Sequence, residues 1–461
     1  MTRVAIVGGG MAGLAAALAL VERRAQGADV EPVLLEAADR LGGTIRTEQT
    51  GGFTIESGPD AFITDKPWAL ALCRRVGIED RLIGTQPGER RTYVVRRGRL
   101  LPVPEGFLLL APTSLTPLAL SPLFSWSGKL RMALDLVLPR RNDDADESVS
   151  AFIRRRLGRE AYDRVGEPLV GGIYTGDAEK LSLVATMPRF RELERKHRSI
   201  ILALRAAARG APAAGARYSL FVSHRDGMAG LVADLAQRLP EGAVRLRSPV
   251  ESLARDGTRW RLRAGDATLD ADAVILAAPA WAAARLVDPL DRTLARALEG
   301  IEYVSSATLT LGYRTADLPA GLPGFGFVVP RVERRVLLAC TYASRKFAGR
   351  APAGHDLLRV FVGGAHNPGA VDLDDETLVS RVRDELRGLL GVAATPVLLR
   401  VDRHRRAMPQ YTVGHLARVA AIEARVAALP GLHLAGAAYR GVGIPDCVRS
   451  GEAAASAAVP A

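Results

Sequence analysis

The sequence predicts a mixed α/β fold of two or three domains, and three observations predict it. The chain has 461 residues, which is more than one hydrophobic core usually supports. Residues 4–36 have the order strand, glycine-rich turn, helix and strand of a βαβ unit. Strand-like runs return in residues 243–279, whereas helical patterns dominate residues 129–209. A nucleotide-binding sheet combined with further sheet and helical units fits this order.

The first turn has the spacing of a dinucleotide-binding loop. Gly8, Gly10 and Gly13 fit G-x-G-x-x-G: the first allows the tight turn, the second lets a pyrophosphate approach, and the third lets helix and strand pack closely. Glu36 ends the next strand, where a carboxylate accepts hydrogen bonds from a ribose. These residues alone leave NAD and FAD open.

Local patterns justify the later elements. The apolar residues of 149–157 fall on one stripe of a helix. Residues 140–147, which mix both charges, are expected to be a solvated linker. Asp256 and Gly257 form a favourable hairpin turn between two alternating runs.

Charge and cysteine content exclude several classes of protein. The net charge is +12, but the basic residues are dispersed and no reader motif accompanies them, so nucleic acid is not an expected partner. A multiply anionic small molecule remains consistent with that charge. The cysteines Cys73, Cys340 and Cys447 are far apart and cannot pair completely, which favours a reducing compartment. No metal site is expected.

The N-terminal residues and one apolar segment indicate where in the cell the protein is expected. Four glycines at turn spacing, followed by Glu22 and Arg23, argue against a signal peptide and favour a cytoplasmic protein. Residues 106–128 are uncharged, but three internal prolines forbid a membrane-spanning helix. This window is therefore either a buried core segment or an apolar lip that touches a membrane or an apolar ligand.

Three further motifs point to a flavin. Residues 37–47 form a second glycine turn beside Arg40 and Arg46, which resembles the second dinucleotide motif of FAD-containing amine oxidases and is absent from NAD dehydrogenases. Residues 56–62, "ESGPDAF", resemble the segment beneath the flavin ring in that superfamily. Residues 432–458 have the pattern of a strand, a glycine-rich turn and a helix that opens near Asp446, whose N-terminus would face the flavin.

FAD is therefore the expected cofactor, and the family resemblance described next implies that it is bound without a covalent link. The residues expected to contact it are Gly8, Gly10, Met11, Ala12, Gly13, Glu36, Ala37, Arg40, Gly42, Gly43, Gly58, Pro59, Asp60, Val250, Gly436, Gly443 and Ile444.

Over nearly its whole length the chain resembles the oxygen-dependent porphyrinogen oxidases of haem biosynthesis. Residues 171–190, 361–391, 405–423 and 439–451 carry this resemblance. It implies an FAD domain of the p-hydroxybenzoate-hydroxylase type, a substrate domain, and a helical domain that contacts the bilayer in membrane-associated members. The expected boundaries are 1–65, 220–282 and 425–461 for the FAD domain, 66–87 and 283–424 for the substrate domain, and 88–219 for the helical domain.

The resemblance implies removal of six electrons from a porphyrinogen in three hydride transfers to flavin N5. Oxygen then takes the electrons and gives hydrogen peroxide. Such chemistry needs orientation and a flat apolar slot, so no catalytic triad is expected. Coproporphyrinogen III is favoured over protoporphyrinogen IX, because the "GPDAF" and "MPQYTVGHL" segments resemble soluble bacterial members that prefer the tetracarboxylate. Arginines suit its propionates.

Four side chains are candidates for substrate binding, although each also has an ordinary structural explanation: Arg46, Lys66, Tyr174 and Arg440. His404 and His415 are expected to be structural, because no partner cluster accompanies them.

Three other functions are consistent with part of these motifs. A flavin amine oxidase needs paired aromatic walls beside the flavin, and here Tyr439 supplies at most one. A carotenoid desaturase-like enzyme needs longer apolar lining. A non-enzymatic flavin-binding scaffold predicts bound FAD without turnover. Peripheral contact with the inner face of a membrane and the oligomeric state stay open.

Overall fold

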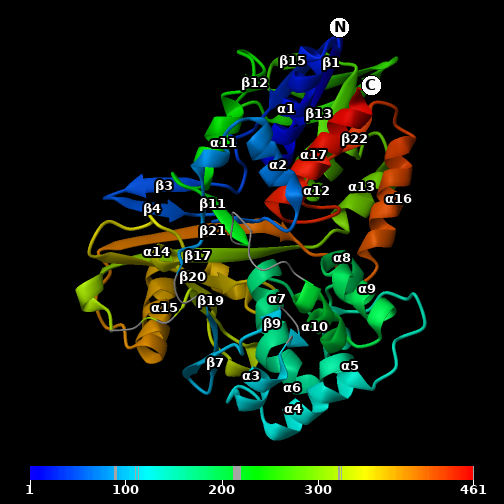
Figure 1. Ribbon diagram of the computed structural model, residues 1–461. Coiled ribbons are helices and arrows are strands. Elements are labelled where there is room, and N and C mark those ends of the chain that lie inside the picture. The colour runs from blue at the N-terminus through cyan, green and yellow to red at the C-terminus, as the bar shows by residue number, and fades with distance from the viewer. Residues whose placement is uncertain are drawn as a thin grey trace.

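The computed structural model describes residues 1–87, 91–108, 111–112, 114–210, 220–319, 322 and 324–459. Its first sheet lies at the end of the molecule where both chain ends are found (Figure 1). The five strands are parallel and their order is β12-β2-β1-β16-β22. Their bounds are β12 (Val244–Arg245), β2 (Val30–Leu35), β1 (Thr2–Val7), β16 (Ala273–Leu276) and β22 (Leu432–Leu434). The predicted βαβ unit is confirmed, because α1 (Met11–Ala25) connects the parallel strands β1 and β2.

Both faces of this first sheet are covered. On one face α1 and α17 (Ile444–Ala458) pack so closely that a Cβ on Gly451 would lie 2.1 Å from the Ala12 carbonyl oxygen. A three-stranded sheet and three helices cover the other face. Their bounds are β13 (Val250–Asp256), β14 (Arg259–Ala264), β15 (Ala267–Ala271), α12 (Ala280–Val287), α13 (Arg292–Glu299) and α16 (His415–Ala427). The predicted hairpin is confirmed, because Asp256 pairs with Arg259 across a turn in which Gly257 has a φ of +61°.

The second sheet has the strand order β21-β17-β20-β19-β18-β7-β8, and only β18 and β7 run parallel. The bounds are β21 (Leu398–Pro409), β17 (Tyr303–Arg314), β20 (His355–Gly363), β19 (Leu337–Tyr342), β18 (Gly326–Val328), β7 (Thr92–Arg96) and β8 (Arg99–Pro102). Leu309 and Val360 lie on the face that packs against α15 (Asp375–Leu390). Since side chains alternate along a strand, Thr308 and Arg359 lie on the opposite face.

A helical unit packs against Val94, Val328 and Ala339 of the second sheet. Its helices are α3 (Leu115–Leu120), α4 (Trp126–Ala133), α5 (Val149–Leu157), α6 (Arg159–Ala161), α7 (Glu167–Tyr174), α8 (Leu183–Thr186), α9 (Pro188–His197) and α10 (Ile200–Gly210). The short 3-10 helix η2 (Leu134–Leu136) follows α4, and a π-helical turn, Tyr162–Gly166, joins α6 to α7. The predicted apolar stripe of α5 is confirmed, because its apolar side chains are buried.

Short elements connect these units. They are β3 (Thr47–Thr50), β4 (Phe53–Glu56), β5 (Phe62–Ile63), β6 (Leu82–Gly84), β9 (Phe107–Leu108), β10 (Ala111–Pro112), β11 (Phe221–His224), α2 (Pro67–Arg75), α11 (Met228–Ala236) and α14 (Ala343–Lys346).

Several elements pack outside the domain that the sequence assigns to them. β7 and β8 fall in the predicted helical segment 88–219, but they join the second sheet because Tyr93 and Val95 contribute to its core. α2, α13 and α16 fall in the predicted substrate segments, but their apolar faces pack against the first sheet. The division into three domains otherwise stays a prediction.

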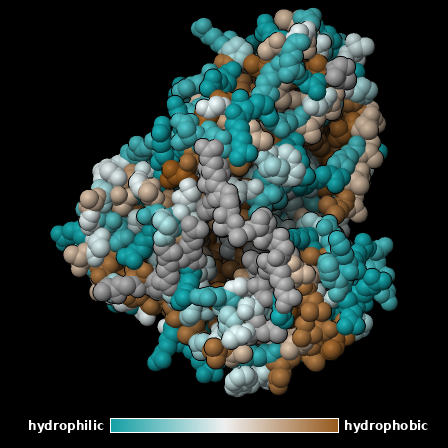
Figure 2. Space-filling view, viewed as in Figure 1, coloured by the Kyte–Doolittle hydropathy of each residue, from teal (hydrophilic) through white to brown (hydrophobic). Residues whose placement is uncertain are grey.

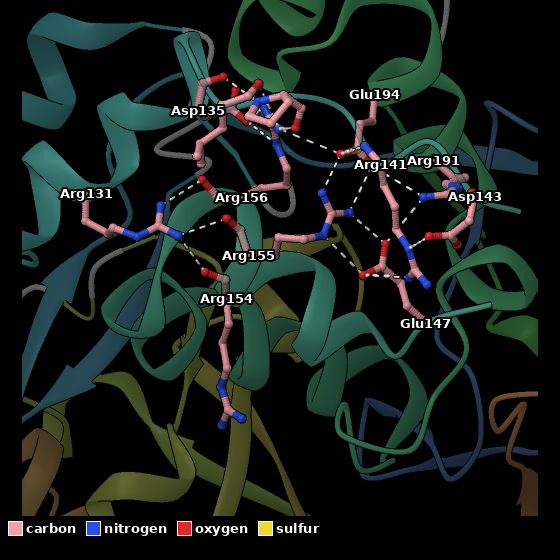
Figure 3. Close-up of polar contacts among 12 residues, drawn as sticks. Arg131, Asp135, Arg141, Asp143, Glu147, Arg154, Arg155, Arg156, Arg191 and Glu194 are labelled. Atoms are coloured by element: carbon pink, nitrogen blue, oxygen red, sulfur yellow. Dashed lines mark hydrogen bonds and ion pairs between the residues drawn. The ribbon is translucent and has the colours of Figure 1, made fainter. Parts of the chain in front are cut away.

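The expectation of a solvated linker over residues 140–147 is wrong at one end. Glu147 is buried and pairs with Arg155 on α5, whose guanidinium also binds Glu194 on α9. Figure 3 shows Arg155 between these two carboxylates, with Arg141 and Arg191 beside them. A run of mixed charge is typical of a solvated segment, but here Glu147 is paired with Arg141 and Arg155 within the fold.

The uncharged window 106–128 is partly core and partly surface. Leu118, Leu123 and Phe124 are buried, whereas Leu120 and Trp126 are 81% and 72% exposed. Residues 109, 110 and 113 of the window lie outside the described residues. Within the described part of the chain, no helix is long and apolar enough to cross a membrane.

Candidate functional site

The first glycine loop leaves a hollow at the carboxyl end of β1. Gly8 has a φ of +111°, and a Cβ there would lie 2.7 Å from the Ala277 carbonyl oxygen. A Cβ on Gly13 would lie 1.9 Å from the Gly8 carbonyl oxygen, so helix and strand touch. Apart from its neighbours in the chain, a Cβ on Gly10 would meet no atom of the described residues within 4 Å. The open space thus lies before the N-terminus of α1, whose first amides have no partner within the helix and favour an anion.

The second glycine loop lies against the first. The Gly42 amide donates to the Gly9 carbonyl over 2.8 Å, and a Cβ on Gly43 would lie 3.4 Å from the Cα of Gly10. The Arg40 guanidinium donates to the carbonyls of Gly43 and Ile45 over 2.7 and 2.9 Å. In this structure Arg40 therefore holds the loop in shape, and direct contact of Arg40 with the cofactor stays a prediction.

Glu36 borders the same hollow. Its Oε2 accepts a hydrogen bond of 2.6 Å from the Gly9 amide, and its Oε1 accepts one of 2.8 Å from the Ala38 amide. Each oxygen keeps a lone pair for a ribose hydroxyl. The Ser248 amide donates to the Glu36 carbonyl, which brings the start of β13, and with it Val250, beside this carboxylate.

The predicted flavin segment, residues 56–62, crosses the second loop. A Cβ on Gly58 would lie 1.8 Å from the Thr44 carbonyl oxygen, so only glycine fits there. Asp60 pairs with Lys346 over 2.9 Å. Burial opposes ionisation of Asp60, but the charges of Lys346 and Arg359 hold the pKa of Asp60 below its usual value.

The C-terminal turn supplies a third open backbone position. Gly436 has a φ of +120°, and a Cβ on it would meet nothing within 4 Å. Helix α17 begins at Ile444, close to the expected Asp446, and Gly443 is its N-cap. Asp446 is buried, and its Oδ2 accepts hydrogen bonds from the Gly443 amide and from Lys66, over 3.3 and 2.6 Å.

Three of the four candidate substrate-binding side chains have partners within the protein. Lys66 is paired with Asp446, and Arg440 is exposed and paired through two nitrogens with Glu423 on α16. The Tyr174 hydroxyl donates to the Thr186 carbonyl over 2.9 Å, and burial raises its pKa. Arg46 is exposed, and its guanidinium makes no ion pair or hydrogen bond with the residues that the structure describes. Arg46 is thus the candidate with a free cation beside the flavin segment.

Three aromatic or imidazole side chains have structural contacts. The His404 ring bonds to the Ser57 carbonyl, and the His415 ring bonds to the Tyr439 carbonyl, as expected for structural histidines. Tyr439 itself packs in the core formed by α12, α13 and α16. Tyr439, the one aromatic side chain of this turn that could form an amine-oxidase wall, therefore lies in the protein core.

Sequence reasoning missed two cations at the flavin segment. Lys346 follows β19 and pairs with Asp60, and Arg359 on β20 donates to the Ser57 carbonyl. The only signal for Arg359 is a charged residue inside the apolar run Leu357–Val362. Lys346 gives no signal, since it stands in an ordinary polar stretch.

Comparison with known proteins agrees with this geometry. A family model described as flavin containing amine oxidoreductase matches residues 11–459. Coproporphyrinogen III oxidase of Bacillus subtilis (strain 168) is 36% identical over 99% of this chain and 97% of its own length. Protoporphyrinogen oxidase of Bos taurus is 34% identical over 98% of this chain and 97% of its own.

Solved structures show the same fold. A crystal structure from Exiguobacterium sp. 255-15 has a TM-score of 0.87 and 33% identity, and it covers 99% of this chain and 98% of that one. Cyclohexylamine oxidase from Brevibacterium oxydans IH-35A has a TM-score of 0.70 at 20% identity, over 99% of this chain and 98% of its own. The second likeness concerns the fold alone.

Proposed function

Because this chain belongs to the flavin containing amine oxidoreductase family, we propose that it binds FAD non-covalently and oxidises a porphyrinogen to a porphyrin in haem biosynthesis, with oxygen as electron acceptor. The observation that carries the proposal is the full-length likeness to named coproporphyrinogen III and protoporphyrinogen oxidases at 34–36% identity. Bound FAD supplies the chemistry: it accepts hydride from the substrate and returns the electrons to oxygen as hydrogen peroxide.

The residues present fit FAD of the p-hydroxybenzoate-hydroxylase type of binding domain. The hollow at Gly10, between two glycine loops and before α1, fits a pyrophosphate. The lone pairs of Glu36 fit a ribose. The open position at Gly436 and the N-terminus of α17 fit the flavin end, where the helix dipole favours negative charge.

Coproporphyrinogen III is the substrate we favour. Three curated relatives at 31–36% identity carry the name coproporphyrinogen III oxidase. Its four propionates need cations, and Arg46 offers an exposed guanidinium beside the flavin segment. The protein's part in the reaction is to bind and orient this substrate against the flavin and to exclude water.

The test is growth of porphyrin fluorescence in air when the purified yellow protein meets coproporphyrinogen III or protoporphyrinogen IX. Each trace is compared with a blank without protein. We expect enzyme-dependent fluorescence with both compounds and the faster rate with coproporphyrinogen III. Two traces that match their blanks, from a protein that holds FAD, would rule out porphyrinogen oxidation and leave amine oxidation or a scaffold role.

We also propose that an exposed apolar surface on α4 and the segments beside it contacts an anionic membrane surface. This surface, called the lip below, extends beyond the window 106–128 and consists of Leu120, Trp126, Leu130, Leu134 and Val137. Trp126, Leu130, Leu134 and Val137 are spaced three or four residues apart, as on one face of a helix. The Lys129 ammonium lies 4.3 Å from the Trp126 ring centroid. Brown side chains gather at this lower edge of the molecule (Figure 2). Apolar side chains can enter the boundary between the headgroups and the acyl chains of a membrane, and a neighbouring cation can bind anionic headgroups.

Removal of apolar side chains from the lip is expected to weaken membrane binding. The variant Leu130→Ser/Val137→Ser should bind about a hundredfold less to sedimented vesicles of phosphatidylcholine and phosphatidylglycerol than the parent protein, because about 0.8 kcal/mol is lost for each CH₂-sized group that no longer enters the membrane. Val397→Ser, at an exposed position just before β21, is the matched control and should bind like the parent. Parent protein that stays in the supernatant would contradict a membrane role for the lip.

A further inference from the structure

Three neighbouring strands of the second sheet each direct one side chain to the same backbone oxygen. The Ser57 carbonyl accepts hydrogen bonds from Arg359 Nη2 over 2.9 Å, from His404 Nε2 over 2.8 Å and from Thr308 Oγ1 over 3.2 Å. Arg359 Nη2 also donates to the Gly58 carbonyl. These are the first two residues after β4, in the segment expected beneath the flavin ring.

The strand register explains why these side chains meet. β17 lies between β21 and β20, with Ser306 opposite His404 and Thr310 opposite Arg359. Side chains two residues apart on a strand share one face, so Thr308 lies on the same face as its neighbours. The sheet therefore holds the Ser57 carbonyl from three positions that are far apart in sequence.

Arg359 is a buried cation without a carboxylate partner. It is 5% exposed, and among the described residues its guanidinium makes hydrogen bonds to carbonyls and forms no ion pair. Asp60, the acid that acts on it most strongly, is paired with Lys346. Burial lowers the pKa of Arg359, and the charges of Asp60 and Glu56 oppose that change. A guanidinium stays protonated in proteins, so the positive charge persists here.

The neighbouring acids form no ion pair with Arg359. Burial raises the pKa of Glu56, whose two oxygens accept hydrogen bonds from the Thr47 hydroxyl and the Met228 amide. Arg350, also buried, donates to the His224 carbonyl and to the Ser223 hydroxyl, which in turn donates to the Asp60 carbonyl over 2.7 Å. The base of the flavin segment thus holds three cations, Arg350, Arg359 and Lys346, beside two carboxylates, Asp60 and Glu56.

We propose that Arg359 is a positioning residue for the flavin: it fixes the carbonyls of Ser57 and Gly58, and its buried positive charge makes the bound flavin easier to reduce. The inference rests on the proposed binding of FAD at this segment. A positive charge in a low-dielectric site favours the reduced ring, which carries more negative charge than the oxidised ring.

Two variants of the FAD-loaded protein separate charge from position. Arg359→Gln removes the positive charge. Arg359→Lys keeps the charge but replaces the planar guanidinium, with its several N–H donors, by one ammonium group. The readout is the ratio of oxidised to reduced flavin in equilibrium with redox dyes, followed by absorbance. We expect Arg359→Gln to raise this ratio about tenfold at a fixed potential, and Arg359→Lys to change it less. The kcat of Arg359→Gln should fall, with KM for the porphyrinogen little changed.

Arg403→Gln is the matched control. Arg403 also donates to backbone carbonyls, those of Val371 and Leu373, and it pairs with Asp375. It is next to His404 on β21, so its side chain lies on the opposite face of the sheet from the flavin segment, and its loss should leave the ratio unchanged. Should Arg359→Gln fail to fold, Asp60→Asn decides: it removes the negative charge that acts most strongly on Arg359 and should lower the ratio, whereas an unchanged ratio would contradict an effect of charge at this segment. Thr308→Val removes one anchor without a charge and should keep the parent ratio. A yellow, active Arg359→Gln protein with the parent ratio would overturn this inference and leave the proposed function intact. A parent protein that holds no FAD would overturn the proposed function.

Discussion

Arg156→Leu lowers the free energy of unfolding by about 3–5 kcal/mol, because it leaves a buried carboxylate without its partner. Arg156 and Asp135 are both 0% exposed. Arg156 Nε donates to Asp135 Oδ1 over 2.6 Å, and Nη2 donates to the Asp135 carbonyl over 2.8 Å. The second Asp135 oxygen accepts from the Ser199 hydroxyl and the Ile201 amide. Figure 3 shows this pair beside the Arg155 cluster.

The measurement is urea unfolding followed by circular dichroism at neutral pH. Arg159→Leu is the control, since Arg159 is 85% exposed and its pair with Asp163 at 3.3 Å is a surface pair four residues apart. Such pairs contribute about 0.5 kcal/mol or less. Equal losses in the two variants would show that the buried pair is no stronger than a surface pair.

Gly10→Val abolishes retention of FAD. The hollow beside Gly10 has no protein atom within 4 Å of a Cβ position, so a valine side chain occupies the space that a pyrophosphate needs. The fold should survive, because Gly10 has an extended ψ of −178° and a negative φ that valine adopts. The measurement is flavin absorbance per protein after purification and dialysis against FAD.

Gly388→Val on α15 is the matched control for this variant. Its Cβ position is also open, but it lies on the far side of the second sheet, and the control protein should stay yellow. Full flavin absorbance in Gly10→Val would contradict the assignment of the first glycine loop to the cofactor.

Local sequence predicts the features that depend on local geometry. The turn at Gly8, the close packing at Gly13 and the hairpin at Asp256 and Gly257 all follow from backbone demands within a few residues. The family resemblance adds Gly58, whose lack of a side chain is required by the Thr44 carbonyl. The fold class and the βαβ unit are predictable for this reason.

Other features depend on contacts between distant segments, and the sequence does not predict them. Arg359 reaches the Ser57 carbonyl only because β20, β17 and β21 are neighbours in the sheet. Glu147 is buried because Arg155 and Arg191 surround it, although its own segment is highly charged. Lys66 and Arg440 resemble free cations in sequence, but each is paired in the fold.

The contact between Gly451 and the Ala12 carbonyl sets an order for biosynthesis. The first sheet takes β1 and β2 from the start of the chain, but β16, β22 and α17 are translated much later. A nascent chain that ends before α17 has an α1 whose apolar face is only partly covered. Bringing α17 back to α1 closes a loop of most of the chain, which costs conformational entropy. Only the contacts between α1 and α17, which form late, offset that cost. Flavin uptake should therefore follow the synthesis of α17, and until then the partly uncovered apolar face of the first helix is exposed to aggregation.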